Sequence, residues 1–291
     1  MVQISASMVK ELRERSGAAM MDCKKALVES SGDFDKAIEW LRKKGVASAG
    51  KKAQRATSEG LIVGQVSDCG KKAAILEVNC ETDFVAKNEE FSALCEKLAT
   101  IALANKSKSA EELQSAKGEE GTVQEILTAS IAKTGENVQI ARVEYLELSG
   151  DGVIGLYIHK LGGKMGALLE LKSDKAPSEK EKATELAREL AMHIVSTKPE
   201  YLTRDEVPKE VIDEEFRIES SKSDLEKKPA EIREKIVKGR VDKILAEKCF
   251  AEQPFVKDPS KTTLEYLESQ GKELGAKFEP SRFTLFVLGA Q

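Results

Sequence analysis

Aromatic residues, histidines and long apolar runs are all scarce in this sequence, and each shortage argues against a class of function. Aromatics make up 5% of the 291 residues, and the only histidines are His159 and His193. The H-E-x-x-H pattern of zinc hydrolases is missing. The five cysteines are odd in number and include no C-x-x-C pair, so the sequence predicts neither a zinc ribbon nor a redox dithiol.

Net charge and hydropathy argue against nucleic-acid and membrane partners. The formal net charge is −4, whereas nucleic-acid binders usually carry a strong basic excess. No apolar run approaches the roughly 20 residues that span a bilayer, and the charged, amphipathic N-terminus is unlike a signal peptide. Scattered free cysteines fit a reducing compartment. We therefore expect a soluble, cytoplasmic protein with no direct nucleic-acid or membrane partner.

Phosphate-binding motifs occur only in imperfect form. A formal G-x-G-x-x-G begins at Gly150, but residues 153–158 predict a strand where a dinucleotide site needs a helix. A second glycine-rich stretch, ending in Gly70–Lys71, has the wrong spacing for a phosphate loop and no Ser or Thr after the lysine. The sequence therefore predicts no cofactor, no metal site and no catalytic residue. We expect a protein that acts by binding and not as an enzyme.

The N-terminal region predicts three short helices. Ser7 is expected to cap the first helix, and Gly17 to end it in a left-handed conformation. Asp33 is expected to cap the third helix, and Gly45 to end it. The small and basic residues at 47–58 are then expected to form a linker.

The central region predicts a duplicated unit, in which a β-hairpin is followed by a helix. Residues 61–78 form the first predicted hairpin and residues 152–171 the second. The two copies match at an offset of about 92 residues, with hairpin, turn and helix in the same order. In this match Leu76–Glu77 meets Leu169–Glu170. We therefore predict two α+β subdomains with antiparallel sheets.

A charge-dense region near the C-terminus predicts an antiparallel helical hairpin that projects from the body. Pro208 starts its first helix and Pro229 its second. Residues 282–287 predict a last strand that returns to the sheet, and the sequence leaves open whether the hairpin self-associates. The predicted fold class is α+β. Its predicted divisions are a three-helix N-terminal domain at 1–46, a linker at 47–58, two core subdomains at 59–147 and 148–202, a helical-hairpin module at 203–248 and a C-terminal segment at 249–291 that returns to the core.

The stretch Glu81–Asn88 joins the first predicted hairpin to its helix and contains an apolar pair, Phe84 and Val85. A lone Phe normally fills a core. The second copy reads Ser-Asp-Lys-Ala-Pro-Ser at 173–178 and contains no aromatic. If the fold required a buried aromatic at this place, the second copy would be expected to have one too. We therefore predict that Phe84 is an exposed anchor for a pocket on a partner, with Asp83 beside it.

Met20 and Met21 open the second predicted helix. Adjacent helical residues point about 100° apart, so both side chains cannot face the same small core. In one interpretation a single methionine packs inside and the other is available to a partner, where a flexible thioether is well suited. In the other interpretation both lie half-buried between helices.

Several strings resemble the bacterial elongation factor Ts family, over essentially the whole chain. Ile4–Gly17 and Met20–Leu27 resemble the opening of that family, and Val78–Ala86 resembles its central signature. Further similar strings are Ala191–Ile194, Lys198–Pro199, Gln253–Val256 and Pro259–Thr262. The resemblance implies a ubiquitin-associated-like three-helix N-terminal domain, a duplicated α+β core and a helical-hairpin module.

The resemblance also implies a partner, the GTPase elongation factor Tu, and a role as its guanine-nucleotide exchange factor in translation elongation. The residues that it assigns to disturbing the magnesium and phosphate site of the partner, so that GDP leaves and GTP binds, are Thr82, Asp83, Phe84 and Val85. Those that it assigns to partner contact are Leu12, Met20, Met21 and His159. Without the resemblance, a scaffold and a regulatory subunit of an enzyme remain as alternative binding functions.

Overall fold

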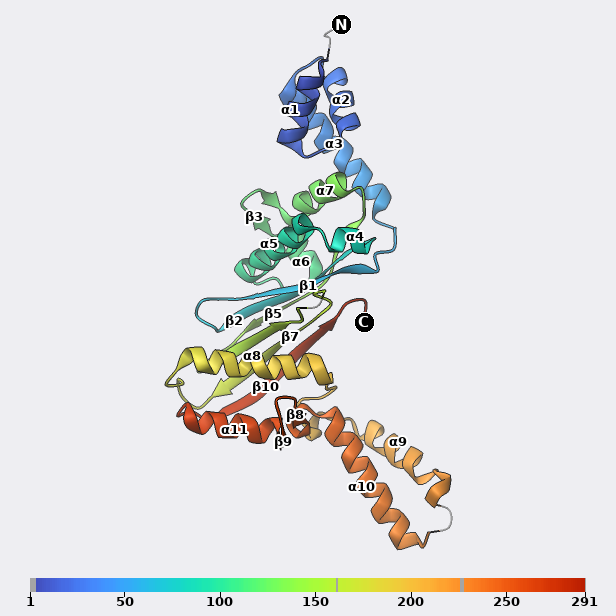
Figure 1. The fold of residues 1–291 in the computed structure, drawn as a ribbon, viewed down its shortest axis with the longest axis vertical. Helices are drawn as coiled ribbons and strands as arrows, with labels where there is room; N and C mark the ends of the chain where they lie inside the picture. Colours follow the sequence, from blue (N-terminus) through green and yellow to red (C-terminus); the bar gives the residue numbers. More distant parts are fainter. Residues whose placement is uncertain (1–3, 161, 226–227, 291) are drawn as a thin grey trace.

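The computed structural model describes residues 4–160, 162–225 and 228–290, and the ends of the predicted divisions at 1–3 and 291 lie outside these ranges. The molecule is elongated (Figure 1). Three N-terminal helices are followed by a helical layer, two sheets, a second helical layer and a projecting helical hairpin. Within the described residues, no helix is long and apolar enough to cross a membrane.

The N-terminal helices are α1 (Ala6–Ser16), α2 (Met20–Glu29) and α3 (Phe34–Lys52). Gly17 ends α1 with a φ of 65°, and the Asp33 carboxylate caps α3, as predicted. The cap of α1 differs from the prediction, because the Ser5 hydroxyl, not that of Ser7, accepts from the Met8 backbone N–H at 3.3 Å.

Helix α3 does not end at Gly45, so that prediction is wrong, and the first part of the predicted linker at 47–58 is helical. The reason is packing against α7 (Val123–Thr134). Gly45 faces α7 here, and even a Cβ on it would lie at an ordinary contact distance, 3.6 Å, from the Cβ of Ala132. Ala49, one turn further on, is buried in the core of the first sheet.

The first sheet contains β1 (Glu59–Val66), β2 (Lys72–Cys80) and β5 (Val138–Glu147), antiparallel and in the order β1-β2-β5. Helix α5 (Glu89–Asn105) covers the face that carries Leu76 and Val78. The remaining elements between β2 and β5 are α4 (Asp83–Ala86), α6 (Ala110–Ser115), β3 (Lys117–Gly118), β4 (Gly121–Thr122) and α7.

The second sheet contains β6 (Gly152–Ile158), β7 (Met165–Ser173) and β10 (Phe278–Val287), antiparallel and in the order β10-β7-β6. Helix α8 (Lys180–Thr197) covers its outer face. In both sheets the second strand of a hairpin is central, a helix follows it, and a later strand pairs with its free edge. The connectivity therefore repeats, as the sequence predicts, and the predicted last strand is confirmed as β10.

The two sheets pack face to face through a small apolar cluster that includes Ile62, Ile75, Ile154 and Leu168. The edges of the sheets also touch, because the Ile62 N–H donates to the Gly163 carbonyl at 2.6 Å. This contact places the turn between β6 and β7 beside the beginning of β1.

The predicted helical hairpin consists of α9 (Lys209–Ser220) and α10 (Ala230–Lys248), which begin directly after Pro208 and Pro229. Figure 1 shows the hairpin projecting from the body. The other elements around its base are the 3-10 turns Arg204–Glu206, Ser223–Leu225 and Phe250–Glu252, the strands β8 (Pro254–Phe255) and β9 (Asp258–Thr262), and α11 (Thr263–Glu273).

Candidate partner-binding site

Helix α4 is a single turn between β2 and α5, and it carries most of the predicted site. Thr82 caps it, because its hydroxyl accepts from the Val85 N–H at 3.4 Å. Ala86 is buried and Val85 is partly buried against the core of the first sheet. The lower side of the turn therefore packs onto the body, and its other side is left for Asp83 and Phe84.

Phe84 is 83% exposed, so the alternative in which it fills the core is excluded. Only one member of the predicted apolar pair is exposed, because Val85 packs inward. A large aromatic side chain in water is unfavourable for an isolated protein, since burying a Phe is worth about 1.5–3 kcal/mol. The exposed ring is therefore available to a partner, as the prediction requires.

Three hydrogen bonds to one carboxylate, that of Glu136, hold the start of α4 in place. Glu136 accepts from the backbone N–H groups of Glu81 at 3.1 Å and Thr82 at 3.0 Å, and from the Thr82 hydroxyl at 2.6 Å. The Glu81 carboxylate in turn accepts from the Asn137 N–H at 2.6 Å. Sequence reasoning missed Glu136, because no local spacing connects it to a turn more than fifty residues earlier.

One ion pair lies within the α4 segment, and a second joins the turn between β6 and β7 to β1. Lys87 pairs with Asp83 at 2.6 Å, and Lys164, in the turn between β6 and β7, pairs with Glu59 at 2.7 Å. The hydrogen bond from Lys87 lowers the pKa of Asp83, and the nearby charge of Lys164 adds a smaller contribution in the same direction. The Asp83 side chain is therefore anionic at neutral pH, next to the exposed ring.

His159 follows the last residue of β6 and is half-buried. Its N–H donates to the Met165 carbonyl at 2.9 Å, and its Nδ1 lies 3.3 Å from the Tyr157 hydroxyl. The same turn bonds to Ile62 and pairs with Glu59 on β1. Phe84 and His159 thus come from the two different sheet units, and both segments border the beginning of β1.

In the N-terminal helices, the packing expected for the two methionines needs correction. Met20 is 53% exposed and Met21 70% exposed, so neither interpretation of the pair holds and both side chains are on the surface. Helix α2 instead faces its small core with Cys23 and Leu27. Leu12 is fully buried in that core, so in this structure its side chain supports the three helices and offers no exposed surface; its contact with a partner stays a prediction.

The N-terminal helices are fixed to the body on the side of α7. Lys52 donates to the Ile131 carbonyl at 3.3 Å. Gly17 lies close to the aliphatic part of Lys133, whose amine pairs with Glu90 in the first turn of α5 at 2.7 Å. A short path of contacts therefore leads from the end of α1 to the helix that follows α4.

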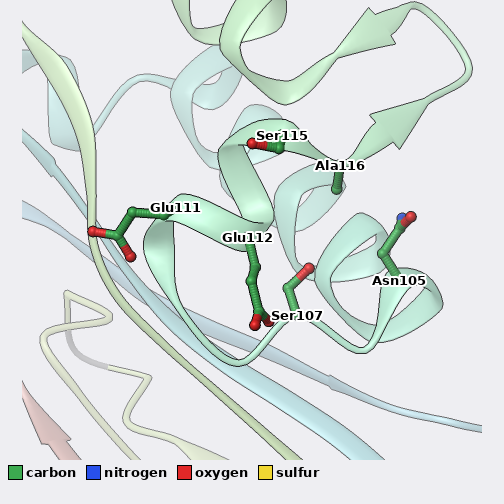
Figure 2. Close-up of a pocket in the computed structure, with 6 residues that line it drawn as sticks. All are labelled: Asn105, Ser107, Glu111, Glu112, Ser115 and Ala116. Atoms are coloured by element: carbon green, nitrogen blue, oxygen red, sulfur yellow. The ribbon is translucent and has the colours of Figure 1, made fainter.

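A shallow pocket elsewhere on the first sheet unit is lined by Asn105, Ser107, Glu111, Glu112, Ser115 and Ala116 (Figure 2). Figure 2 shows Glu112 directed toward Ser107 and Glu111 directed away from it. The Glu112 carboxylate accepts from the Lys108 N–H at 2.7 Å, an ordinary contact at a helix start. Across residues 4–160, 162–225 and 228–290, no three His, Cys, Asp or Glu side chains are placed to hold a metal ion.

Comparison with known proteins decides the family. The family described as "Elongation factor TS" matches residues 81–290, a range that begins at the turn carrying Phe84. The chain belongs to the elongation factor Ts family. A protein named elongation factor Ts from Clostridium botulinum is 44% identical over 288 residues, covering 98% of this chain and 93% of that protein. The elongation factor Ts of Nitratiruptor sp. is 43% identical over 286 residues, with the same two coverages. That of Methylococcus capsulatus is 44% identical over 289 residues, covering 99% of this chain and 93% of its own.

Proposed function

We propose that this protein is a translation elongation factor Ts, a guanine-nucleotide exchange factor for elongation factor Tu. The observation that carries the proposal is the exposed Phe84 ring on a capped and hydrogen-bonded turn. Membership of the elongation factor Ts family supports the identity of the partner. The protein acts in the cytoplasm, where translation takes place, and it binds its partner without covalent chemistry.

In this mechanism the Phe84 ring enters between helices of the GTPase domain, and Asp83 accompanies it. Thr82 and Val85 hold the turn from below, so that it does not yield as the ring inserts. Insertion displaces these helices of the partner, which first disturbs its magnesium site and then its phosphate loop. GDP then leaves. A thousandfold faster release requires a barrier lower by about 4 kcal/mol. One or two well-buried anchors can supply such an amount.

Two further surfaces hold the partner while the ring acts. Met20 and Met21 contact the GTPase domain with flexible apolar side chains. His159, on the turn after β6, contacts another part of the partner. The coupling is reciprocal: the protein lowers the affinity of the partner for GDP, and GDP lowers the affinity of the partner for the protein by the same factor. Nucleotide therefore displaces the protein, which can act again.

Stopped-flow release of fluorescent GDP from elongation factor Tu tests this function. Catalytic amounts of the protein are expected to accelerate release, and the isolated protein is expected to bind no GDP. A scaffold or an enzyme subunit would leave the release rate unchanged at saturating protein, and that result would refute the proposal.

A further inference from the structure

β10 stays paired with β7 up to its last residue, Val287, and the chain around and just beyond that end contacts the first sheet. Figure 1 shows β10 running from the lower helical layer to a C-terminus beside the first sheet. Residues 286–289 of this end are called the terminal segment here. Phe286 is buried in the apolar cluster between the sheets, and Leu288 packs against that cluster.

An ion pair in the first sheet receives the terminal segment. Glu77 on β2 is only 2% exposed, and its carboxylate accepts from Arg142 Nε on β5 at 2.8 Å. The other carboxylate oxygen accepts from the Gly289 N–H at 2.9 Å. Arg142 also donates to the Val287 carbonyl at 2.7 Å, and its guanidinium lies 4.1 Å from the centre of the Phe286 ring. Besides pairing with each other, both charged groups thus contact the terminal segment.

The terminal segment also holds the turn that carries His159. The Leu288 N–H donates to the Lys164 carbonyl at 2.9 Å, and the Lys164 amine pairs with Glu59 at the start of β1. One short segment therefore contacts β2, β5 and the turn between β6 and β7. These contacts leave little freedom for one sheet to rotate against the other.

The second sheet contains a matched pair that lacks these connections. Glu170 is equivalent to Glu77, is 5% exposed, and lies opposite Arg282 beside a β-bulge, as Glu77 lies opposite Arg142. Its partners are Ser281 at 2.5 Å and Arg282 at 3.6 Å on the neighbouring strand, and Lys172 at 3.9 Å on its own strand, all within the same sheet. The bulge and the buried acid therefore repeat, but only the first pair is hydrogen-bonded to the other sheet unit.

We propose that Glu77, Arg142 and the terminal segment form a latch that holds the two sheet units at one relative placement. The latch keeps Phe84 and His159 at the spacing that a single partner requires. Its members are positioning residues, because they are separate from the proposed contact surface. This inference rests on the proposed function only for its effect on exchange, since the placement of the sheets can be measured in the free protein.

The first readout is a distance between spin labels in the full-length protein, at Glu89→Cys and Lys160→Cys, two exposed positions on the two units. Cys69 is exposed and is replaced by serine, whereas the other four cysteines are buried. We expect one narrow distance distribution for the parent and a broad one after deletion of residues 288–291, which removes the Leu288 and Gly289 donors. The deletion keeps the Glu77–Arg142 pair, so it leaves no buried charge without a partner.

The second readout is the dependence of GDP release on protein concentration. A latch that opens lowers the fraction of molecules competent to bind, so the half-maximal concentration is expected to rise about tenfold while the maximal rate stays near that of the parent. Arg142→Lys removes the planar contact with Phe286 and is expected to give a milder change in the same direction. Arg282→Lys, the matched control, is expected to change neither the distance distribution nor the half-maximal concentration.

The outcomes separate the latch from the exchange function. A narrow, unchanged distance distribution in the deletion variant would overturn the latch, and so would equal broadening in Arg282→Lys. If the deletion variant does not fold, Arg142→Lys decides by the same two criteria. If the parent fails to accelerate GDP release but the distance broadens as expected, the latch stands and the proposed function falls.

Discussion

The segments that follow the two hairpins occupy equivalent places and make different contacts. After β2, the chain forms α4 and turns Phe84 outward. After β7, residues 173–178 form no helix, and the Ser178 hydroxyl instead donates to the Leu274 carbonyl at 2.9 Å. The repeated fold is complete without an aromatic at this place. Folding therefore does not require Phe84, which is consistent with the binding role that we propose for it.

The largest expected effect is that of Phe84→Ala. An exposed ring contributes little to folding, so the melting temperature is expected to stay within a degree or two of that of the parent. Loss of a central anchor typically costs about 2 kcal/mol or more, which corresponds to roughly thirtyfold slower catalysed release at saturating protein. Stopped-flow release and a melting curve measure the two effects. The control is Ala176→Phe, which places an aromatic on the second unit and is expected to leave the release rate unchanged; faster release would break the comparison.

The support of α4 is tested by Glu136→Ala, which leaves three donors without their acceptor. We expect stability to fall by about 2 kcal/mol, and release to slow several-fold because the turn is no longer held. Glu136→Gln keeps one acceptor oxygen and is expected to lie between parent and Ala variant in both measurements. Normal release from a destabilised Ala variant would show that the turn needs no such support.

A smaller effect is expected at the N-terminal helices. Replacing Met20 and Met21 together by Ala should weaken binding to elongation factor Tu by about 1–2 kcal/mol in calorimetry and leave the melting curve unchanged. Val28→Ala, at a site on α2 that is 56% exposed, is the control and should alter neither quantity. Leu12→Ala should instead lower the stability of the three helices by about 2–5 kcal/mol, as loss of a buried Leu does. Undiminished affinity in the double variant would remove the methionines from the contact surface.

The smallest effect on exchange is expected from His193, which is fully buried on α8, remote from α4. Its Nδ1 accepts from the Val256 N–H at 3.3 Å, and its Nε2 lies 2.9 Å from Oε1 of the Gln253 side-chain amide. Burial lowers the pKa of His193, and the hydrogen bond with Gln253 opposes this shift.

As the pH falls through the pKa of about 6.5 of an unfolded histidine, the unfolded chain gains a proton that the folded chain does not. The free energy of unfolding therefore decreases below that pH. Urea unfolding at pH 8 and pH 5.5 measures the decrease, which is expected to be smaller in His193→Gln. An equal decrease in both proteins would assign the pH dependence to other groups.

Much of the fold follows from local signals in the sequence. Gly17, Asp33, Pro208 and Pro229 mark helix ends through backbone preferences that need no tertiary contact, and the structure has all four in place. The exposure of Phe84 was also predictable, because the second unit supplied an internal comparison. The sequence could not reveal where α3 ends, since its last turns pack against α7 and the core of the first sheet, both formed by residues far along the chain.

The supports of the candidate site are less predictable than its exposed residues. Glu136 and the Glu77–Arg142 pair act through contacts between segments distant in sequence, and nothing in their own neighbourhood distinguishes them from ordinary charged residues. Leu12, which the resemblance assigns to partner contact, is fully buried. A resemblance assigns a position to a site, but only the packing of that position decides whether its side chain is available.

The central claim is that the protein and GDP each weaken the binding of the other to elongation factor Tu. One pair of affinities tests this claim most directly. Calorimetry gives the affinity of the protein for elongation factor Tu without nucleotide and with saturating GDP. The account predicts a weaker affinity for the GDP-bound form, by the same factor by which the protein weakens GDP binding, and a smaller factor for Phe84→Ala. Equal affinities for the two forms would contradict it, because a protein that does not distinguish them cannot favour the release of GDP.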